Sequence, residues 1–270
     1  MCTAVILRRP GHNWPLLFAG NRDEMRDRPS KAPARHWHDR PSVTGGLDLS
    51  GGGTWLGINE YGLLSAVLNR VGSLGPQEGK RSRGELVLEA LDHNDADSAA
   101  KALSSLNPAA YRSFNLIIAD NRDAFWLRNQ SKDDTRKVEC FAIPEGLSMI
   151  SAYDMNDVKS AHIGRHIADF RKAAAPEPET WRQDDTQTAP SGWESWHEIL
   201  RRNAAESGGD PFAAMSVQLD NGFETVSSSL IALPSAEFHA ACPEEARIRW
   251  LFANGSPRTA AYTPVSPIEI

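Results

Sequence analysis

Short apolar and β-branched runs separated by turn residues dominate the first third of the chain. Residues 3–9 are typical of a strand, a Pro-Gly turn follows, and residues 16–20 are typical of a returning strand. This pattern predicts a hairpin with Cys2 at its open end. Residues 55–58 and 63–69 predict a second hairpin. The N-terminal part is therefore expected to form antiparallel sheet.

Helical periodicity and capping residues appear further along the chain. Ser82 and Ser191 each stand three positions before a Glu, as in a capping box, and Asp95 is a candidate cap of another helix. Residues 156–174 also read as a helix. Strands and helices follow one another in runs, with few βαβ units, so we expect an α+β or layered α/β fold with mainly antiparallel sheets. Further strands are predicted at 114–119, 124–128, 138–143, 225–233, 238–241 and 247–253.

Length and composition restrict the class of protein. A chain of 270 residues with 40% hydrophobic and 24% charged residues is typical of a soluble globular protein, and we expect a single domain over residues 1–270. The net charge of −6 argues against an obligate nucleic-acid partner. No apolar run approaches the ~20 residues of a membrane span. Three scattered cysteines make no disulfide framework, so a cytoplasmic location is expected, and the sequence does not indicate an oligomeric state.

Cys2 is the first candidate for chemistry. It follows an initiator Met, which is usually removed before a small residue, and removal would leave a thiol and a free α-amine on one residue. Their ordinary pKa values, about 8.5 and about 7.7–8.0, let the amine accept the thiol proton near neutral pH. The alternative is that Cys2 is only a small apolar residue at the start of a buried strand.

Two other polar clusters can be interpreted either as functional sites or as ordinary solvent-exposed segments. The tetrad Asn-Arg-Asp-Glu at residues 21–24 follows the returning strand and is expected near Cys2, either as a catalytic surround or as a solvated strand end. His36 and His38 point the same way in an extended chain, but no third ligand is evident. We therefore predict no metal site.

The first 120 residues carry a specific set of motifs. With the tetrad at 21–24, the chain resembles the NRDE family, also called the transport and Golgi organisation 2 family. The other matching positions are Met1 and Cys2, residues 28–30, 46–48, 52–57, Asn69, 83–86 and 114–116.

More distantly, the N-terminal half is similar to the choloylglycine hydrolase and penicillin V acylase branch of the N-terminal nucleophile (Ntn) hydrolases. The resemblance implies a four-layer αββα sandwich of the α+β class. It also implies that Cys2 is the nucleophile, that Asp23 orients the α-amine, and that Asn69 contributes to an oxyanion hole. A preorganised donor of that kind stabilises a transition state by ~3 kcal/mol.

The chain departs from that branch at two positions, where Gly20 and Val226 replace arginines. Arg22 is a candidate catalytic residue in their place. In a regular strand it points away from Asp23, so it faces Cys2 only if Asp23 does not, or if a bulge intervenes. Expected substrate-binding residues from the matched motifs are Asn21, Glu24, Trp55, Arg70 and Arg83.

Two functions from different classes follow from this sequence. The first is a cysteine amidohydrolase or acyltransferase that acts on a small linear amide and needs no cofactor. The second is a non-catalytic haem-binding or haem-trafficking protein, because members of the family it resembles have been linked to haem handling. Histidines, methionines or cysteines would supply the axial ligand, and the lack of a CxxCH motif makes any haem non-covalent.

Overall fold

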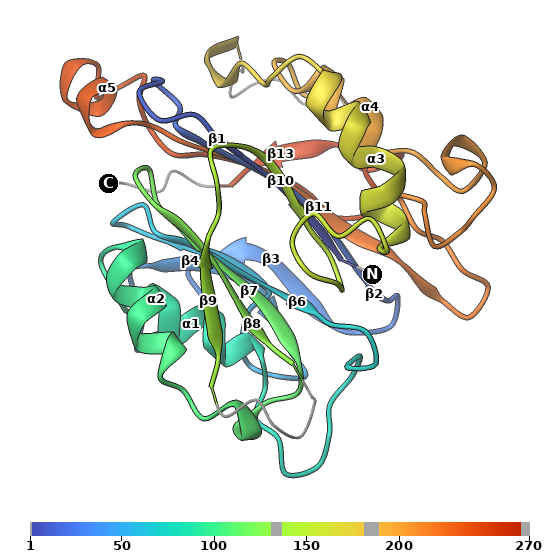
Figure 1. Ribbon diagram of the computed structural model, residues 1–270. Coiled ribbons are helices and arrows are strands. Elements are labelled where there is room, and N and C mark those ends of the chain that lie inside the picture. Colours follow the sequence, from blue (N-terminus) through green and yellow to red (C-terminus); the bar gives the residue numbers. More distant parts are fainter. Residues whose placement is uncertain (1, 131–136, 181–188, 266–270) are drawn as a thin grey trace. The chain divides into compact units, whose positions relative to one another are not determined.

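The computed structural model describes residues 2–130, 137–180 and 189–265 and divides into two compact units (Figure 1). Within the described residues, unit 1 combines residues 2–28 with 145–265, and unit 2 consists of residues 29–144. The chain therefore begins in unit 1, builds unit 2, and returns to complete unit 1. A single domain over residues 1–270 stays a prediction.

Unit 1 contains an antiparallel sheet of six strands among the described residues. The first hairpin lies inside it: Thr3 is opposite Asn21 and Arg8 is opposite Leu16. The second strand of the hairpin also pairs with a long strand from the far end of the sequence. The order across the sheet is β10 (Gly146–Ile150), β1 (Thr3–Arg8), β2 (Leu16–Met25), β11 (Phe223–Leu233), β12 (Arg249–Ala253) and β13 (Tyr262–Pro264).

One face of this sheet packs on helices (Figure 1). Alternate residues of β1 and β2, such as Val5, Leu17 and Ala19, are fully buried against apolar side chains of these helices, including Phe170 and Trp196. Each large buried side chain contributes about 1.5–3 kcal/mol. The helices are α3 (Ala161–Lys172), α4 (Glu194–Leu200) and α5 (Ala236–Ala241), with 3₁₀ turns at Pro178–Thr180 and Ala205–Ser207.

Unit 2 contains an antiparallel sheet of seven described strands, in chain order from β3 to β9. Two helices cover one face of this sheet and bury Leu86, Leu91 and Leu103 against Leu116 and Leu127. The strands are β3 (Ser30–Ala34), β4 (Val43–Asp48), β5 (Leu56–Asn59), β6 (Leu64–Asn69), β7 (Phe114–Ala119), β8 (Ala124–Asn129) and β9 (Glu139–Ala142); the helices are α1 (Gly84–Leu91) and α2 (Ala96–Ser104), with a 3₁₀ turn at Pro108–Ala110.

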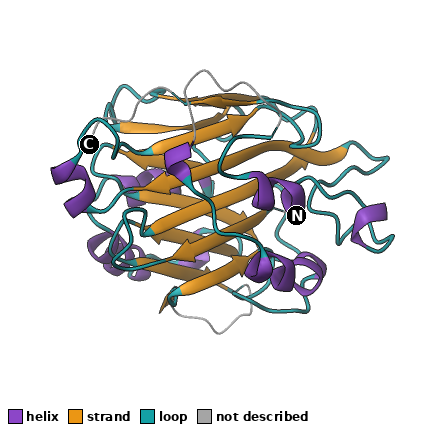
Figure 2. Ribbon diagram, turned by 90° about the horizontal axis from the view of Figure 1, so that it is seen from above, coloured by secondary structure: helices purple, strands orange, loops and turns teal. Residues whose placement is uncertain are grey.

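The predicted α+β class with mainly antiparallel sheets is confirmed, and Figure 2 shows how far strands outweigh helices. The strand predicted at 238–241 is wrong: those residues lie in α5, because the Ser235 side chain accepts a hydrogen bond from the Phe238 N–H and caps a helix. Asp95 caps α2 as predicted. Among the described residues, no helix has both the length and the apolar character needed to cross a membrane.

Candidate active site

Cys2 lies at the open end of the β1–β2 hairpin, as the sequence predicts. Its sulfur is held by the backbone of Asp23: the Asp23 N–H donates to Sγ at 3.4 Å, and the thiol donates to the Asp23 carbonyl at 3.5 Å. Pairing of Thr3 with Asn21 fixes the register that brings these groups together. The thiol is therefore partly buried and fixed in position by the strand that carries the polar tetrad.

The surroundings of Cys2 determine its protonation. Burial raises the pKa of the Cys2 thiol, the nearby Asp23 carboxylate raises it further, and the Arg22 guanidinium lowers it. Because burial is the largest of these effects, the thiol is protonated at neutral pH. Attack by this sulfur therefore needs a base that removes the proton during the reaction.

Asp23 directs its carboxylate to the neighbouring strand β11. Thr225 lies directly opposite Asp23 in the strand register, and its hydroxyl donates to Asp23 Oδ1 at 2.6 Å. The same hydroxyl accepts a hydrogen bond from the Val217 N–H at 2.8 Å, which fixes its orientation. Burial raises the pKa of Asp23, and the hydrogen bond from Thr225 acts in the opposite direction. Thr225 is thus a positioning residue for Asp23 that the sequence did not reveal.

The alternation of side chains along β2 places Arg22 on the same face of the strand as Gly20. Gly20 and Arg22 are two residues apart in β2 and so share a face. A Cβ at Gly20 would lie 3.1 Å from the Phe18 ring and 3.3 Å from the Thr3 carbonyl, so a side chain at this position requires its neighbours to shift by a few tenths of an ångström. Arg22 is only 7% exposed and influences the thiol electrostatically. It provides the positive charge from the same strand face that Gly20 occupies.

Asn21 and Glu24 complete the tetrad and make local contacts. The Asn21 amide donates to the carbonyls of Leu200 at 3.0 Å and Met215 at 2.8 Å, which ties β2 to α4 and to the segment after it. Glu24 accepts a hydrogen bond from the Met25 N–H at 2.9 Å. The tetrad is therefore inside strand β2, where the sequence had suggested that it follows the strand, and substrate binding by either residue stays a prediction.

The remaining predicted site residues belong to unit 2. Asn69 ends β6 and pairs with Phe114, while Arg70 Nη1 donates to Asn115 Oδ1 at 2.7 Å. The Trp55 ring stacks so close to Gly46 that a Cβ there would lie 2.3 Å from it. Arg83 donates to the Ser73 and Ser113 carbonyls at 2.7 and 3.1 Å. The roles of these four residues in catalysis or substrate binding stay predictions.

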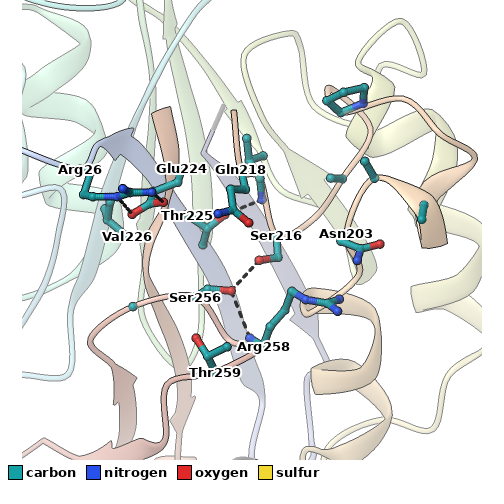
Figure 3. Close-up of a pocket in the computed structure, with 16 residues that line it drawn as sticks. Arg26, Asn203, Ser216, Gln218, Glu224, Thr225, Val226, Ser256, Arg258 and Thr259 are labelled. Carbon is teal, nitrogen blue, oxygen red and sulfur yellow. Dashed lines mark hydrogen bonds and ion pairs between the residues drawn. The ribbon is translucent and has the colours of Figure 1, made fainter. Parts of the chain in front are cut away.

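Val226, the second position where an arginine was expected, lies at an irregularity of the sheet. The register between β11 and β2 shifts between Thr225 and Ser227, which leaves Val226 without an opposite residue. Both Thr225 and Val226 contribute to the wall of a pocket in unit 1 (Figure 3). Thr225, which donates to the Asp23 carboxylate, therefore also lies in the wall of this pocket.

A buried histidine in α3 is expected to make the folding stability of unit 1 fall at acid pH. His162 is 1% exposed, its Nδ1 has no hydrogen-bond partner among the described residues, and burial lowers its pKa to about 3. In the unfolded chain this histidine takes up a proton near pH 6.5, whereas in the folded chain it stays neutral. The contribution of the neutral, buried side chain to folding stability is therefore present above pH 6.5 and is lost as the pH falls towards 3.

At pH 4.5 this difference amounts to ~2–3 kcal/mol. We expect His162→Gln to reduce the loss of unfolding free energy between pH 7 and pH 4.5 by about that amount, measured by urea denaturation. His38→Gln, in an exposed loop, is the control for loss of a histidine. An unchanged pH dependence in His162→Gln would contradict this assignment.

Comparison with known proteins identifies the family. The family model described as Transport and Golgi organisation 2 matches residues 1–232. The chain belongs to this family. It is 42% identical over 113 residues to the Transport and Golgi organization protein 2 homolog of Homo sapiens and 41% identical over the same length to that of Bos taurus. Each match covers 40% of this chain and only 39% of the relative.

Two solved structures are similar to this family member over most of its length. A Caenorhabditis elegans ortholog of N-acylethanolamine-hydrolyzing acid amidase matches with a TM-score of 0.55 at 12% identity, over 97% of this chain and 99% of that chain. A mutant of the conjugated bile acid hydrolase from Clostridium perfringens matches with a TM-score of 0.52 at 13% identity, over 100% and 94%. At these identities the similarity shows the fold alone, and the predicted fold class agrees with it.

Proposed function

We propose that this protein is an N-terminal cysteine amidohydrolase or acyltransferase that acts on a small linear amide. The observation that carries the proposal is the fixed position of Cys2 Sγ, between the backbone N–H and carbonyl of Asp23. The carboxylate of the same Asp23 is held by Thr225. A nucleophile and a buried carboxylate are thus positioned by one residue of one strand.

The protonated thiol defines the first chemical step. The α-amine of a mature chain that begins at Cys2 takes the Sγ proton while sulfur attacks the amide carbonyl carbon. A C–S bond forms and the carbonyl π electrons move to oxygen, where the proposal assigns a donor role to Asn69. When the C–N bond breaks, the ammonium gives this proton to the leaving nitrogen, and a thioester remains on Cys2.

The second step releases the acyl group. The same amine takes a proton from water, whose oxygen attacks the thioester, and the departing sulfur is protonated again. An amine in place of water would give acyl transfer. In both steps Asp23 stabilises the ammonium form of the amine, because a buried carboxylate favours a nearby positive charge. The proposal needs no cofactor and requires that Met1, which lies outside the described residues, is removed.

The named functions of the structurally similar proteins support an amide as the substrate class. One of them is an amidase that hydrolyses N-acylethanolamines, and the other is a hydrolase of conjugated bile acids. The direct test is hydrolysis of a panel of N-acyl amides by the purified full-length chain, with thioester formation on Cys2 followed by mass spectrometry. Absence of both turnover and acyl-Cys2 across the panel would contradict the proposal.

The Arg22 charge gives a prediction about thiol reactivity. Arg22→Gln removes a positive charge that lowers the Cys2 pKa, so the thiolate fraction at pH 7 falls. We expect alkylation of Cys2 by iodoacetamide, quantified by peptide mapping, to be slower in Arg22→Gln than in the unmodified chain. Arg22→Lys keeps the charge and is the matched control, for which we expect a nearly unchanged rate. Equal slowing in both variants would mean that Arg22 acts only through packing.

A further inference from the structure

The pocket behind the Asp23–Thr225 pair has a volume of about 650 Å³ and lies entirely in unit 1. Its walls come from the ends of β2 and β11, from the segment between α4 and β11, and from the segment that follows β12. Figure 3 shows polar side chains from all of these segments around it, including Asn203, Gln218 and Arg258. Cys2 is not part of its wall, so it is a candidate binding site in its own right.

The acceptor groups near this pocket already have partners. Glu224 accepts two hydrogen bonds from Arg26, at 2.7 and 2.6 Å. Glu206 accepts from Arg258 Nη1 at 2.6 Å. The hydroxyls of Ser216 and Ser256 bond to each other at 2.7 Å. Neither carboxylate is therefore available to a cationic ligand without breaking an ion pair.

Several donor groups of the wall, in contrast, have no acceptor among the described residues. Arg258 is fixed through Nη1 to Glu206 and to the Arg201 carbonyl at 2.8 Å, and its Nε and Nη2 have no such partner. The same holds for the side-chain amide N–H groups of Asn203 and Gln218 and for the Thr259 hydroxyl. A guanidinium that is anchored on one nitrogen and open along its Nε–Nη2 edge suits a two-point contact with an oxyanion.

We propose that this pocket binds a small organic or inorganic oxyanion, a carboxylate or a phosphate, with Arg258 as its charged contact. Asn203, Gln218 and Thr259 donate the remaining hydrogen bonds, and the alanines and Val217 in the wall contact the apolar part of an organic ligand. The site is separate from the Cys2 nucleophile and shares only Thr225 with it. Binding is measured without turnover, so this proposal and the proposed hydrolase activity succeed or fail separately.

The test is isothermal titration of the full-length chain with citrate in one arm and inorganic phosphate in the other, at an ionic strength held constant with chloride. We expect saturable binding at one site per chain in at least one arm, and the arm that binds identifies the oxyanion. Arg258→Gln is expected to weaken binding about tenfold or more. Gln218→Leu, whose side chain makes no hydrogen bond within the described residues, is expected to weaken it about three- to fivefold.

Arg247→Gln is the matched control, because Arg247 is an exposed arginine of unit 1 that pairs with Glu244 away from the pocket. This variant is expected to bind like the unmodified protein. If Arg258→Gln unfolds the chain, Gln218→Leu and Thr259→Val decide the question. The proposal is overturned if neither anion saturates below about 10 mM, or if Arg247→Gln weakens binding as much as the pocket variants do.

Discussion

Cys2→Ala is expected to lose amide turnover completely while the chain keeps its fold. The substitution removes the only atom that forms the covalent bond to the acyl group in the proposed mechanism, and it leaves the α-amine in place. The sulfur makes two weak hydrogen bonds with the Asp23 backbone, so its loss costs little stability. Rates on the N-acyl amide panel, together with thermal unfolding, measure both expectations.

Cys140→Ala is the matched control for this variant. Cys140 is an exposed free cysteine of unit 2, so its replacement removes a thiol without touching the β1–β2 hairpin. It is expected to keep full turnover. Residual turnover in Cys2→Ala above that of a no-enzyme blank would show that another residue attacks the substrate.

Asp23→Asn is expected to have opposite effects on two measurable rates. Amide turnover should fall about 10²-fold, because the amine that shuttles the proton loses the carboxylate that stabilises its charged form. Alkylation of Cys2 by iodoacetamide should become faster at pH 7, because the Asp23 charge raises the pKa of the thiol and its removal lowers that pKa. General disruption of the site would slow turnover without accelerating alkylation.

The pH profile adds a second signature of Asp23. Below the pKa of Asp23, which burial raises, the carboxyl group is neutral and no longer supports the ammonium, so turnover should decline on the acid side. This decline should be absent in Asp23→Asn. Thr225→Val keeps the carboxylate and removes the hydroxyl that donates to it and accepts from the Val217 N–H, so it should lower turnover less than Asp23→Asn does and retain the acid limb. Equal profiles in all three proteins would contradict the role of Asp23.

The sequence predicted the hairpin that carries the nucleophile because its signals are local. The apolar runs at residues 3–9 and 16–20 and the intervening turn are enough to define β1 and β2 and to place Cys2 near the tetrad. The end of β2 was predicted too early, because residues 21–24 are polar and strand-end-like. They continue the strand because Asn21 and Asp23 find hydrogen-bond partners in α4, the segment after it and β11.

Other features depend on contacts between distant parts of the chain. Thr225 meets Asp23 across 202 positions of sequence, and the bulge at Val226 exists only in that pairing. The glycine-rich strand β4 was missed because Gly46 is glycine for packing, since the Trp55 ring occupies the space of its side chain. The pocket near Arg258 is formed by parts of unit 1 that are far apart in the sequence, and it has no motif of its own.

The most direct measurement is the intact mass of the native protein before and after reaction with an N-acyl amide, followed by peptide mapping. The proposal predicts a chain that begins at Cys2, without Met1, and one acyl group attached to that residue. A functional protein that retains Met1, or an acyl group attached to any residue other than Cys2, would contradict it.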